Sequence, residues 1–268
     1  MTTLPIYQID AFADRAFNGN PAAVMPLDNW LADELLQAIA MENNLSETAF
    51  IVAGDENYAL RWFTPEVEVD LCGHATLAAA HALFEHLGHA GDELVFDTRS
   101  GELRVSRSSA GLTLDFPVID LKSQEVDMSV CNALGAPANE AMAPASKGGA
   151  VLYVYASEDD VAGLSPDFAA LLAATDVSVI VTAPGNEVDF VSRFFGPQVG
   201  LNEDPVTGSA HCSLVPYWAE RMGKSRLQAR QISQRGGNLD CELRDGRVFM
   251  TGTAVTFMQG TVELSLAR

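Results

Sequence analysis

The chain has 268 residues, of which 48% are hydrophobic and 19% are charged, a composition typical of a globular protein with a large core. Its 16 basic and 36 acidic residues give a formal net charge of −20. Such an acidic surface repels nucleic acid and anionic membranes, so neither is an expected partner, although a local site can still bind a small anion.

The four cysteines, Cys72, Cys131, Cys212 and Cys241, are scattered along the chain. They show no C-x-x-C spacing, so neither a zinc knuckle nor a redox pair is expected. The first residues do not resemble a signal peptide, and no apolar run reaches the roughly 18 residues that a membrane helix needs. We therefore expect a cytoplasmic protein with unpaired thiols.

The first half of the chain predicts strands and two helices. Alternating apolar residues predict a strand over 4–13, and a Gly-Pro turn leads into another before residue 25. Residues 28–44 predict an amphipathic helix with Asp28 as its N-cap. A strand, a proline turn and a second, almost wholly apolar helix over 73–88 follow, and then a meander of short strands over 94–119.

The texture changes near residues 121–150, which are rich in Ala, Pro, Gly and Ser and suggest a junction. A second series then begins. It predicts a strand at 151–157, a short helix at 165–175 and another strand at 177–184.

The two halves contain an internal echo. RWFTPEVEVD at 61–70 and RFFGPQVGLN at 193–202 share Arg, Phe, Pro and Val at matching places. Allowing a three-residue insertion, Gly-His-Ala at 73–75 aligns with Gly-Ser-Ala at 208–210, and each tripeptide opens a largely apolar stretch. Duplication explains this order best. We predict two similar α+β domains, 1–120 and 121–268, with the last strand able to return to the first domain.

The apolar helix in each predicted domain is expected to be buried, most simply inside a curved sheet. A buried helix that begins with glycine, as at Gly73 and Gly208, leaves its first backbone N–H groups without partners inside the helix. These donors and the positive end of the helix dipole favour an anion. Two such helix ends facing one interdomain cleft would suit a small carboxylate or another compact anion.

Three residues are candidates for acid–base chemistry. Glu47 adjoins an apolar strand, where desolvation would raise its pKa, but residue type alone favours a turn or capping role. His74 at a helix N-terminus could act as a neutral imidazole or as a cap. Asp204 precedes the second helix in an Asp-Pro turn, which is a weak signal by itself.

Cys72 could have a lowered thiol pKa at the helix N-terminus. A two-thiol racemase needs a second cysteine, and the aligned residue is Thr207, so Cys72 is expected to pack as a small apolar residue. The remaining histidines lack metal-ligand spacing, and no metal site is expected.

The motifs GNPAAV, NNLSETAFI, RWFTPEVEVDLCGHATLAAAHAL and NEDPVTGSA together resemble those of the PhzF-like isomerase family of phenazine biosynthesis, over essentially the whole chain. The resemblance implies a fold similar to diaminopimelate epimerase: two pseudo-symmetric domains, each a curved, mostly antiparallel sheet or barrel around a central helix. It also implies cofactor-independent isomerisation, by proton transfer at carbon, of a small anionic or zwitterionic substrate in the interdomain cleft, and it suggests a homodimer.

By this resemblance Glu47 is the acid–base residue, and His74 and Asp204 help to bind substrate and relay protons. Gly73, Gly208 and Ser209 would contact the substrate. Two departures from the family pattern are Ala75 after Gly-His and Pro216, which is expected to interrupt the second central helix. A racemase or epimerase using the same cleft, or a binding protein without turnover, are the alternatives.

Overall fold

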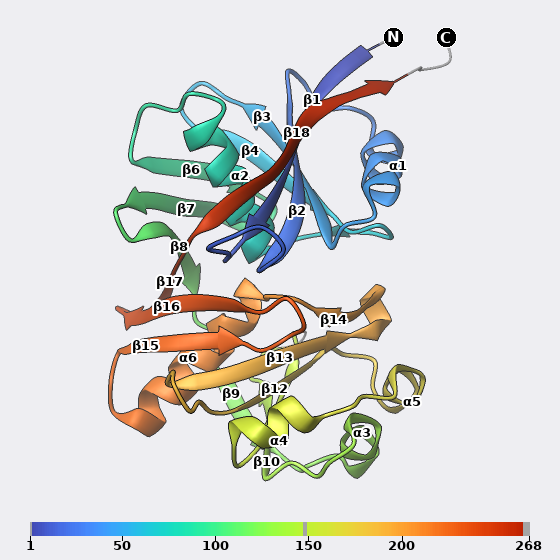
Figure 1. Ribbon diagram of the computed structural model, residues 1–268, viewed down its shortest axis with the longest axis vertical. Helices are drawn as coiled ribbons and strands as arrows, with labels where there is room; N and C mark the ends of the chain where they lie inside the picture. The colour runs from blue at the N-terminus through green and yellow to red at the C-terminus, as the bar shows by residue number, and fades with distance from the viewer. Residues whose placement is uncertain (1, 147–148, 265–268) are drawn as a thin grey trace. The chain divides into compact units, whose positions relative to one another are not determined.

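The computed structural model describes residues 2–146 and 149–264, and the chain divides into two compact units (Figure 1). The first unit comprises Met1–Asp115 and Thr251–Arg268, and the second comprises Phe116–Met250. The sequence places this division slightly later, after residue 120. The last strand, β18 (Ala254–Leu264), belongs to the first unit because it pairs with β1 (Thr2–Ala11) along its whole length.

The first unit is built from one mixed sheet and two helices. The sheet is antiparallel except that β2 runs parallel to β3 and β4 parallel to β6. The remaining elements of this unit are β2 (Asn20–Leu27), α1 (Asp33–Asn43), β3 (Glu47–Ala53), β4 (Tyr58–Phe63), β5 (Glu68–Val69), α2 (Gly73–Glu85), β6 (Glu93–Thr98), β7 (Gly101–Ser108) and β8 (Gly111–Pro117).

The second unit repeats this scheme, because β11 runs parallel to β12 and β13 parallel to β15 among otherwise antiparallel pairs. Its elements are β9 (Leu121–Gln124), α3 (Met128–Leu134), β10 (Glu140–Pro144), β11 (Val151–Val154), α4 (Glu158–Gly163), α5 (Phe168–Ala174), β12 (Val179–Pro184), β13 (Phe190–Gly196), η1 (Pro197–Val199), β14 (Leu201–Asp204), α6 (Gly208–Met222), β15 (Arg226–Gln231), β16 (Gly237–Arg244) and β17 (Arg247–Gly252). The predicted α+β fold with two pseudo-symmetric domains is confirmed.

A central helix fills each unit (Figure 1). In α2 every residue except His81 and Glu85 is buried, and α6 is buried along most of its length. Alanines dominate α2, so the curved strands can approach its backbone closely from several sides. Among the described residues, no helix is long and apolar enough to cross a bilayer.

The repeated Arg-aromatic-Phe motif has a structural role in each unit. Arg61 on β4 makes a two-bond ion pair with Glu68, with N–O distances of 2.7 Å for both bonds. Arg193 on β13 pairs in the same way with Glu203, at 2.8 and 3.0 Å. Each guanidinium also lies over the ring of the phenylalanine two residues later. The echo seen in the sequence therefore records a duplicated clamp between neighbouring strands.

Two local predictions about helices were wrong. The first helix begins at Asp33 with Ala32 as its N-cap, so Asp28 does not cap it. Asp33 and Glu34 lie in the first turn of α1, where negative charge interacts favourably with the positive end of the helix dipole. Asp28 lies five residues before the helix and has no such interaction with it.

Pro216 does not interrupt the second central helix, since α6 runs through it without a break. A proline removes the N–H that would bond the carbonyl four residues earlier, here that of Cys212. That carbonyl instead accepts the backbone N–H of Ile119 at 3.0 Å. The hydrogen bond that α6 loses is thus replaced by one from outside the helix.

Residues 121–150 are more than the junction that the sequence suggested, because they contain β9, α3 and β10.

Burial of the central helix predicts a large stability effect at Leu77, which is fully buried in α2. We expect Leu77→Ala to lower the free energy of unfolding by about 2–5 kcal/mol, because the lost side chain leaves a cavity. Leu172→Ala removes the same atoms from a side chain that is 52% exposed and should cost much less. Urea denaturation of both variants checks this, and equal losses would contradict a tightly packed central helix.

Candidate active site

Several buried side chains of the first unit that carry polar or titratable groups lie at the start of α2. Glu47 is the first residue of β3, His74 is the second residue of α2, and Cys72 is the N-cap of that helix. Since β2 and β3 are parallel, with Ala22 opposite Glu47, the first residue of β2, Asn20, lies at the same end of the sheet. Strand ends and a helix start thus bring four side chains from distant parts of the sequence together.

His74 and Glu47 form a buried pair. The His74 Nε2 atom lies 3.1 Å from Glu47 Oε2, which is an ion-pair distance. The geometry is not that of a hydrogen bond, however, and within residues 2–146 and 149–264 neither atom has a hydrogen-bond partner. A buried carboxylate oxygen not committed to a hydrogen bond is available to accept a proton.

The surroundings of His74 favour its protonated form, so the neutral imidazole expected from its place at a helix N-terminus is wrong. Burial alone would lower the pKa of the imidazole, but the adjacent Cys72 sulfur and Glu47 carboxylate reverse this effect and hold the pKa well above its ordinary value. Of these two neighbours the Glu47 carboxylate has the larger role, because a neutral Cys72 thiol has no charge with which to stabilise the imidazolium. Burial, reinforced by that carboxylate, raises the pKa of the Cys72 thiol to about 11, so Cys72 remains a neutral thiol near pH 7.

Asn20 is a site residue that reasoning from the sequence missed. Its side-chain amide lies 3.1 Å from His74 Nδ1, on the other side of the ring from Glu47. The preceding Gly19 has φ +66°, and a Cβ there would lie 2.1 Å from the carbonyl oxygen of Ala11. Only glycine fits this turn, which fixes the start of β2. The Gly-Asn-Pro tripeptide was the available signal, but nothing in it indicated His74.

The second unit places Asp204 in a different network. Asp204 is buried at the end of β14, and its Oδ2 accepts a short hydrogen bond from the Thr207 hydroxyl. The fully buried Gln231 contacts both residues, because its Nε2 lies 2.7 Å from the Asp204 carbonyl and its Oε1 accepts the Thr207 N–H at 2.8 Å. The structure thus brings Asp204 to the N-terminus of α6, as Glu47 is brought to that of α2.

Both central helices begin without a side-chain cap. Gly73 and Gly208 are their first residues, and neither N-cap side chain, Cys72 or Thr207, bonds to the first turn. His74 and Ser209 occupy the equivalent second positions. The first N–H groups of a helix, which have no partners inside it, and the helix dipole make each end suited to an anion.

Pairing register extends this comparison between the units. Thr48 lies opposite Phe63 in the first unit, and Val179 lies opposite Phe195 in the second. The residue equivalent to Glu47 is therefore Ser178. The first unit carries a carboxylate, a thiol and an imidazole where the second carries three hydroxyl groups. Only the first of these two sets contains titratable groups suited to moving a proton near neutral pH.

The cluster at the start of α2 also contains a set of metal-binding atom types. Within the described part of the chain, ligand atoms of Glu47, Cys72 and His74 lie within 4.8 Å of one another. The sequence had predicted no metal site, because the cysteines show no C-x-x-C spacing and the remaining histidines lack metal-ligand spacing. A metal there would compete with the proton on His74 and with the thiol proton, since both ligands bind metals deprotonated.

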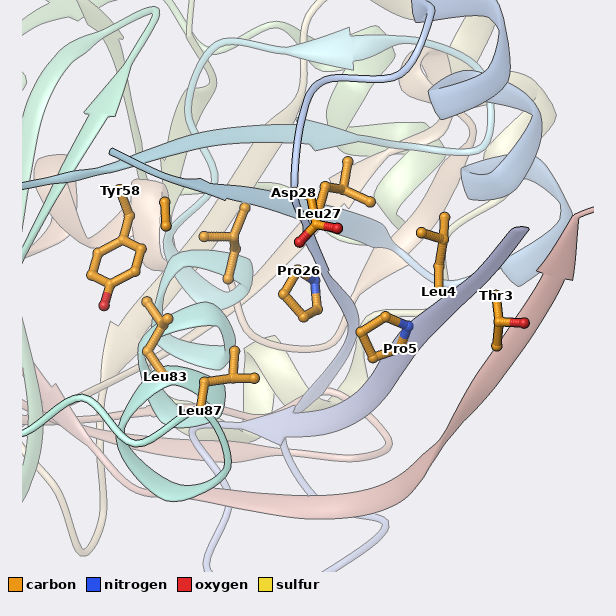
Figure 2. Close-up of a pocket in the computed structure, with 11 residues that line it drawn as sticks. Thr3, Leu4, Pro5, Pro26, Leu27, Asp28, Tyr58, Leu83 and Leu87 are labelled. Atoms are coloured by element: carbon orange, nitrogen blue, oxygen red, sulfur yellow. The ribbon is translucent and has the colours of Figure 1, made fainter. Parts of the chain in front are cut away.

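Two hollows lie away from the Glu47–His74 pair. One, of about 420 Å³, is in the first unit and is lined mainly by apolar side chains at the C-terminal end of α2, including Leu83 and Leu87 (Figure 2). It lies at the far end of the helix from His74 and contains one acidic residue, Asp28. The other, of about 310 Å³, is in the second unit and is lined in part by Ser178 and Ser209.

Comparison with known proteins decides the family. The family of phenazine biosynthesis-like proteins (PhzC-PhzF) matches residues 9–260 of this chain. The chain belongs to this family. An uncharacterized isomerase of Pseudomonas aeruginosa is 54% identical over 261 residues, which cover 97% of this chain and 99% of the relative. The resemblance noted in the sequence is confirmed, and by family the protein is an isomerase.

Solved structures agree with this assignment. A PhzF-family protein of Enterococcus faecalis superposes with a TM-score of 0.92 at 47% identity, covering 98% of this chain and all of that one. A probable proline racemase of Agrobacterium radiobacter K84 has a TM-score of 0.65 at 10% identity, with 98% and 93% coverage, and shares the fold. The predicted epimerase-like architecture is confirmed.

Burial predicts unreactive thiols in the native phenazine biosynthesis-like protein. All four cysteines are buried, and burial raises the pKa of Cys212 to about 12, as it does that of Cys72 to about 11. We expect iodoacetamide at neutral pH to leave the native protein unmodified and to label all four cysteines in urea. Mass spectrometry measures the labelling, and rapid modification of native Cys72 would show it to be a reactive thiolate.

The buried His211 is expected to make the stability of the second unit fall at acidic pH. Burial lowers its pKa from 6.5 to about 4, while its Nδ1 bonds the Thr207 carbonyl at 2.8 Å. Below pH 6.5 the unfolded state binds a proton that the folded state refuses, so stability falls as pH drops from about 6.5 to about 4, by roughly 3 kcal/mol.

The matched variant is His211→Thr. The equivalent residue of the first unit, Thr76, bonds the carbonyl of its own helix N-cap in the same way. We expect this variant to have a flatter stability curve between pH 6.5 and 4, measured by urea denaturation at several pH values. An unchanged acid slope would rule out His211 as its source.

Proposed function

We propose that this isomerase moves a proton between carbon atoms of a small, amino-acid-like carboxylate, with Glu47 as the group that takes and returns the proton. The observation that carries the proposal is the buried Glu47–His74 pair at the uncapped start of α2. The family supports an isomerase, and the buried, titratable pair supports acid–base chemistry at this point.

Glu47 is suited to act first as a base. Its Oε2 has no hydrogen-bond partner within the described residues, while the adjacent imidazole is held toward its protonated form. The Glu47 carboxylate would remove a proton from a substrate carbon. The electron pair of the broken C–H bond would pass into the substrate π-system, and the same proton would be returned from Glu47 to another carbon.

The helix N-termini would stabilise the charge formed in this step. Negative charge would move onto the substrate carboxylate as the C–H bond breaks. The first N–H groups of α2 and α6 are hydrogen-bond donors held in place by the helix, and they would stabilise that charge. Gly73, Gly208 and Ser209 are the residues that we assign to substrate contact, with Asp204 as a polar partner. We propose that the substrate lies in a cleft between the domains and that no cofactor takes part.

Thiol-based racemisation receives no support from the site. Cys72 has a pKa of about 11, and the equivalent position holds Thr207. Two alternatives remain: epimerisation at a single carbon by Glu47, and binding without turnover. A deuterium-exchange experiment distinguishes both from the proposed isomerisation. A cytoplasmic location and a homodimer remain predictions of the sequence.

Deuterium exchange tests the role of Glu47. Candidate amino acids and other small carboxylates are incubated with enzyme in D2O, and deuterium at carbon is followed by NMR. We expect Glu47→Gln to lower the exchange rate about 10²- to 10⁴-fold, because the amide cannot accept the proton.

Cys72→Ala is the control in the same cluster and is expected to retain exchange, because the thiol is neutral. Exchange that survives Glu47→Gln would exclude Glu47 as the proton carrier. If the wild type inverts a stereocentre and Cys72→Ala loses both this inversion and the exchange, a racemase is favoured. Thermal stabilisation by a carboxylate without any exchange in the wild type would indicate a binding protein.

A further inference from the structure

Gln231, the last residue of β15, is fully buried and makes three hydrogen bonds at the start of α6. Its Oε1 accepts the Thr207 N–H at 2.8 Å, and its Nε2 donates to the Asp204 carbonyl at 2.7 Å and to the Thr207 hydroxyl at 3.1 Å. The backbone N–H of Thr207 can only donate, so it must face an oxygen. This contact fixes which end of the side-chain amide points where.

The orientation of the Gln231 amide determines the direction of the next hydrogen bond. Because Gln231 Nε2 donates to the Thr207 hydroxyl, the hydroxyl proton points elsewhere, and it points at Asp204 Oδ2. Asp204 Oδ2 is thus the acceptor of the hydrogen bond from the Thr207 hydroxyl. The order of donors runs from Gln231 through Thr207 to the Asp204 carboxyl group.

The same network keeps α6 uncapped. A threonine at an N-cap ordinarily accepts an N–H from the first turn of its helix. Thr207 occupies the N-cap of α6 and makes no such bond, because its hydroxyl is engaged between Gln231 and Asp204. The start of α6 therefore lacks the side-chain cap that its own threonine could supply.

We propose that Gln231 is a positioning residue of this isomerase: it turns the Thr207 hydroxyl away from α6 and onto Asp204, which orients the carboxyl group and keeps the helix end open to the substrate carboxylate. The consequence for substrate rests on the proposed function. The consequence for the Thr207 side chain does not depend on it.

Two variants separate positioning from simple stability. Gln231→Leu removes all three hydrogen bonds, and we expect the exchange rate to fall up to about 100-fold, with KM raised as well. Gln231→Glu keeps the shape. Its protonated form has one O–H that can donate to the Thr207 hydroxyl, although not also to the Asp204 carbonyl, whereas its ionised form can donate to neither. We therefore expect the activity of Gln231→Glu, relative to wild type, to recover as pH falls.

The control is Gln228→Leu, three residues earlier on the same strand, where the side chain is exposed. It should leave the exchange rate, KM and pH profile unchanged. Recovery at low pH is a result that a structural role of Gln231 alone would not produce. If Gln231→Leu keeps wild-type exchange and KM, or Gln231→Glu shows no pH-dependent recovery in an enzyme that exchanges deuterium, the proposal is overturned.

A crystal structure of Gln231→Leu provides a test that requires no activity, and one of Gln231→Glu at high pH replaces it if the leucine variant does not fold. We expect the Thr207 hydroxyl to leave Asp204 and accept an N–H from the first turn of α6. An unmoved Thr207–Asp204 hydrogen bond would overturn the proposal, even if the wild type catalyses exchange. A rotated hydroxyl in a protein that shows no exchange would support the positioning role and count against the proposed isomerisation instead.

Discussion

The first backbone N–H groups of a helix have no partner inside the helix, and a helix surrounded by protein cannot leave them to bulk water. This constraint applies to the central helix of both units. In both units the central helix begins with glycine, lacks a side-chain cap and has buried polar residues beside its start. An ordinary protein would close such an end with serine or aspartate. Here the N-cap residues are Cys72, which cannot readily do so, and Thr207, which is engaged elsewhere. These two helix starts are the places where we propose that an anionic group of the substrate binds.

The two units share their strand arrangement and differ in the side chains at the start of the central helix. The clamp of arginine, glutamate and phenylalanine has been kept in both units, because it joins neighbouring strands that each fold needs. The positions at the helix start have not been kept. Glu47 and His74 face each other in the first unit, while Ser178 and Ser209 occupy the corresponding places in the second. In the proposed function, proton transfer therefore belongs to the first unit.

What the sequence predicted depended on how local the signal was. The two apolar helices and their initial glycines lie in short continuous stretches, so their burial and place in the fold could be predicted. Glu47 was singled out, yet its residue type alone favoured a turn, and only the fold brings His74 to 3.1 Å from it. Asn20 and Gln231 gave no usable signal, since each meets its partner across more than 20 residues. The break predicted at Pro216 was wrong, because the Cys212 carbonyl accepts a hydrogen bond from the Ile119 N–H, outside the helix.

The pairing of β1 with β18 has a consequence for the order in which the protein is made. The second unit is one continuous segment, Phe116–Met250, whereas the sheet of the first unit includes strands from both ends of the chain. During synthesis the second unit has all its residues before β18 leaves the ribosome, and domains tend to fold as units. The half that begins first is therefore the half completed last. Until that final strand arrives, the edge of β1 that it will cover remains open to pairing with other chains.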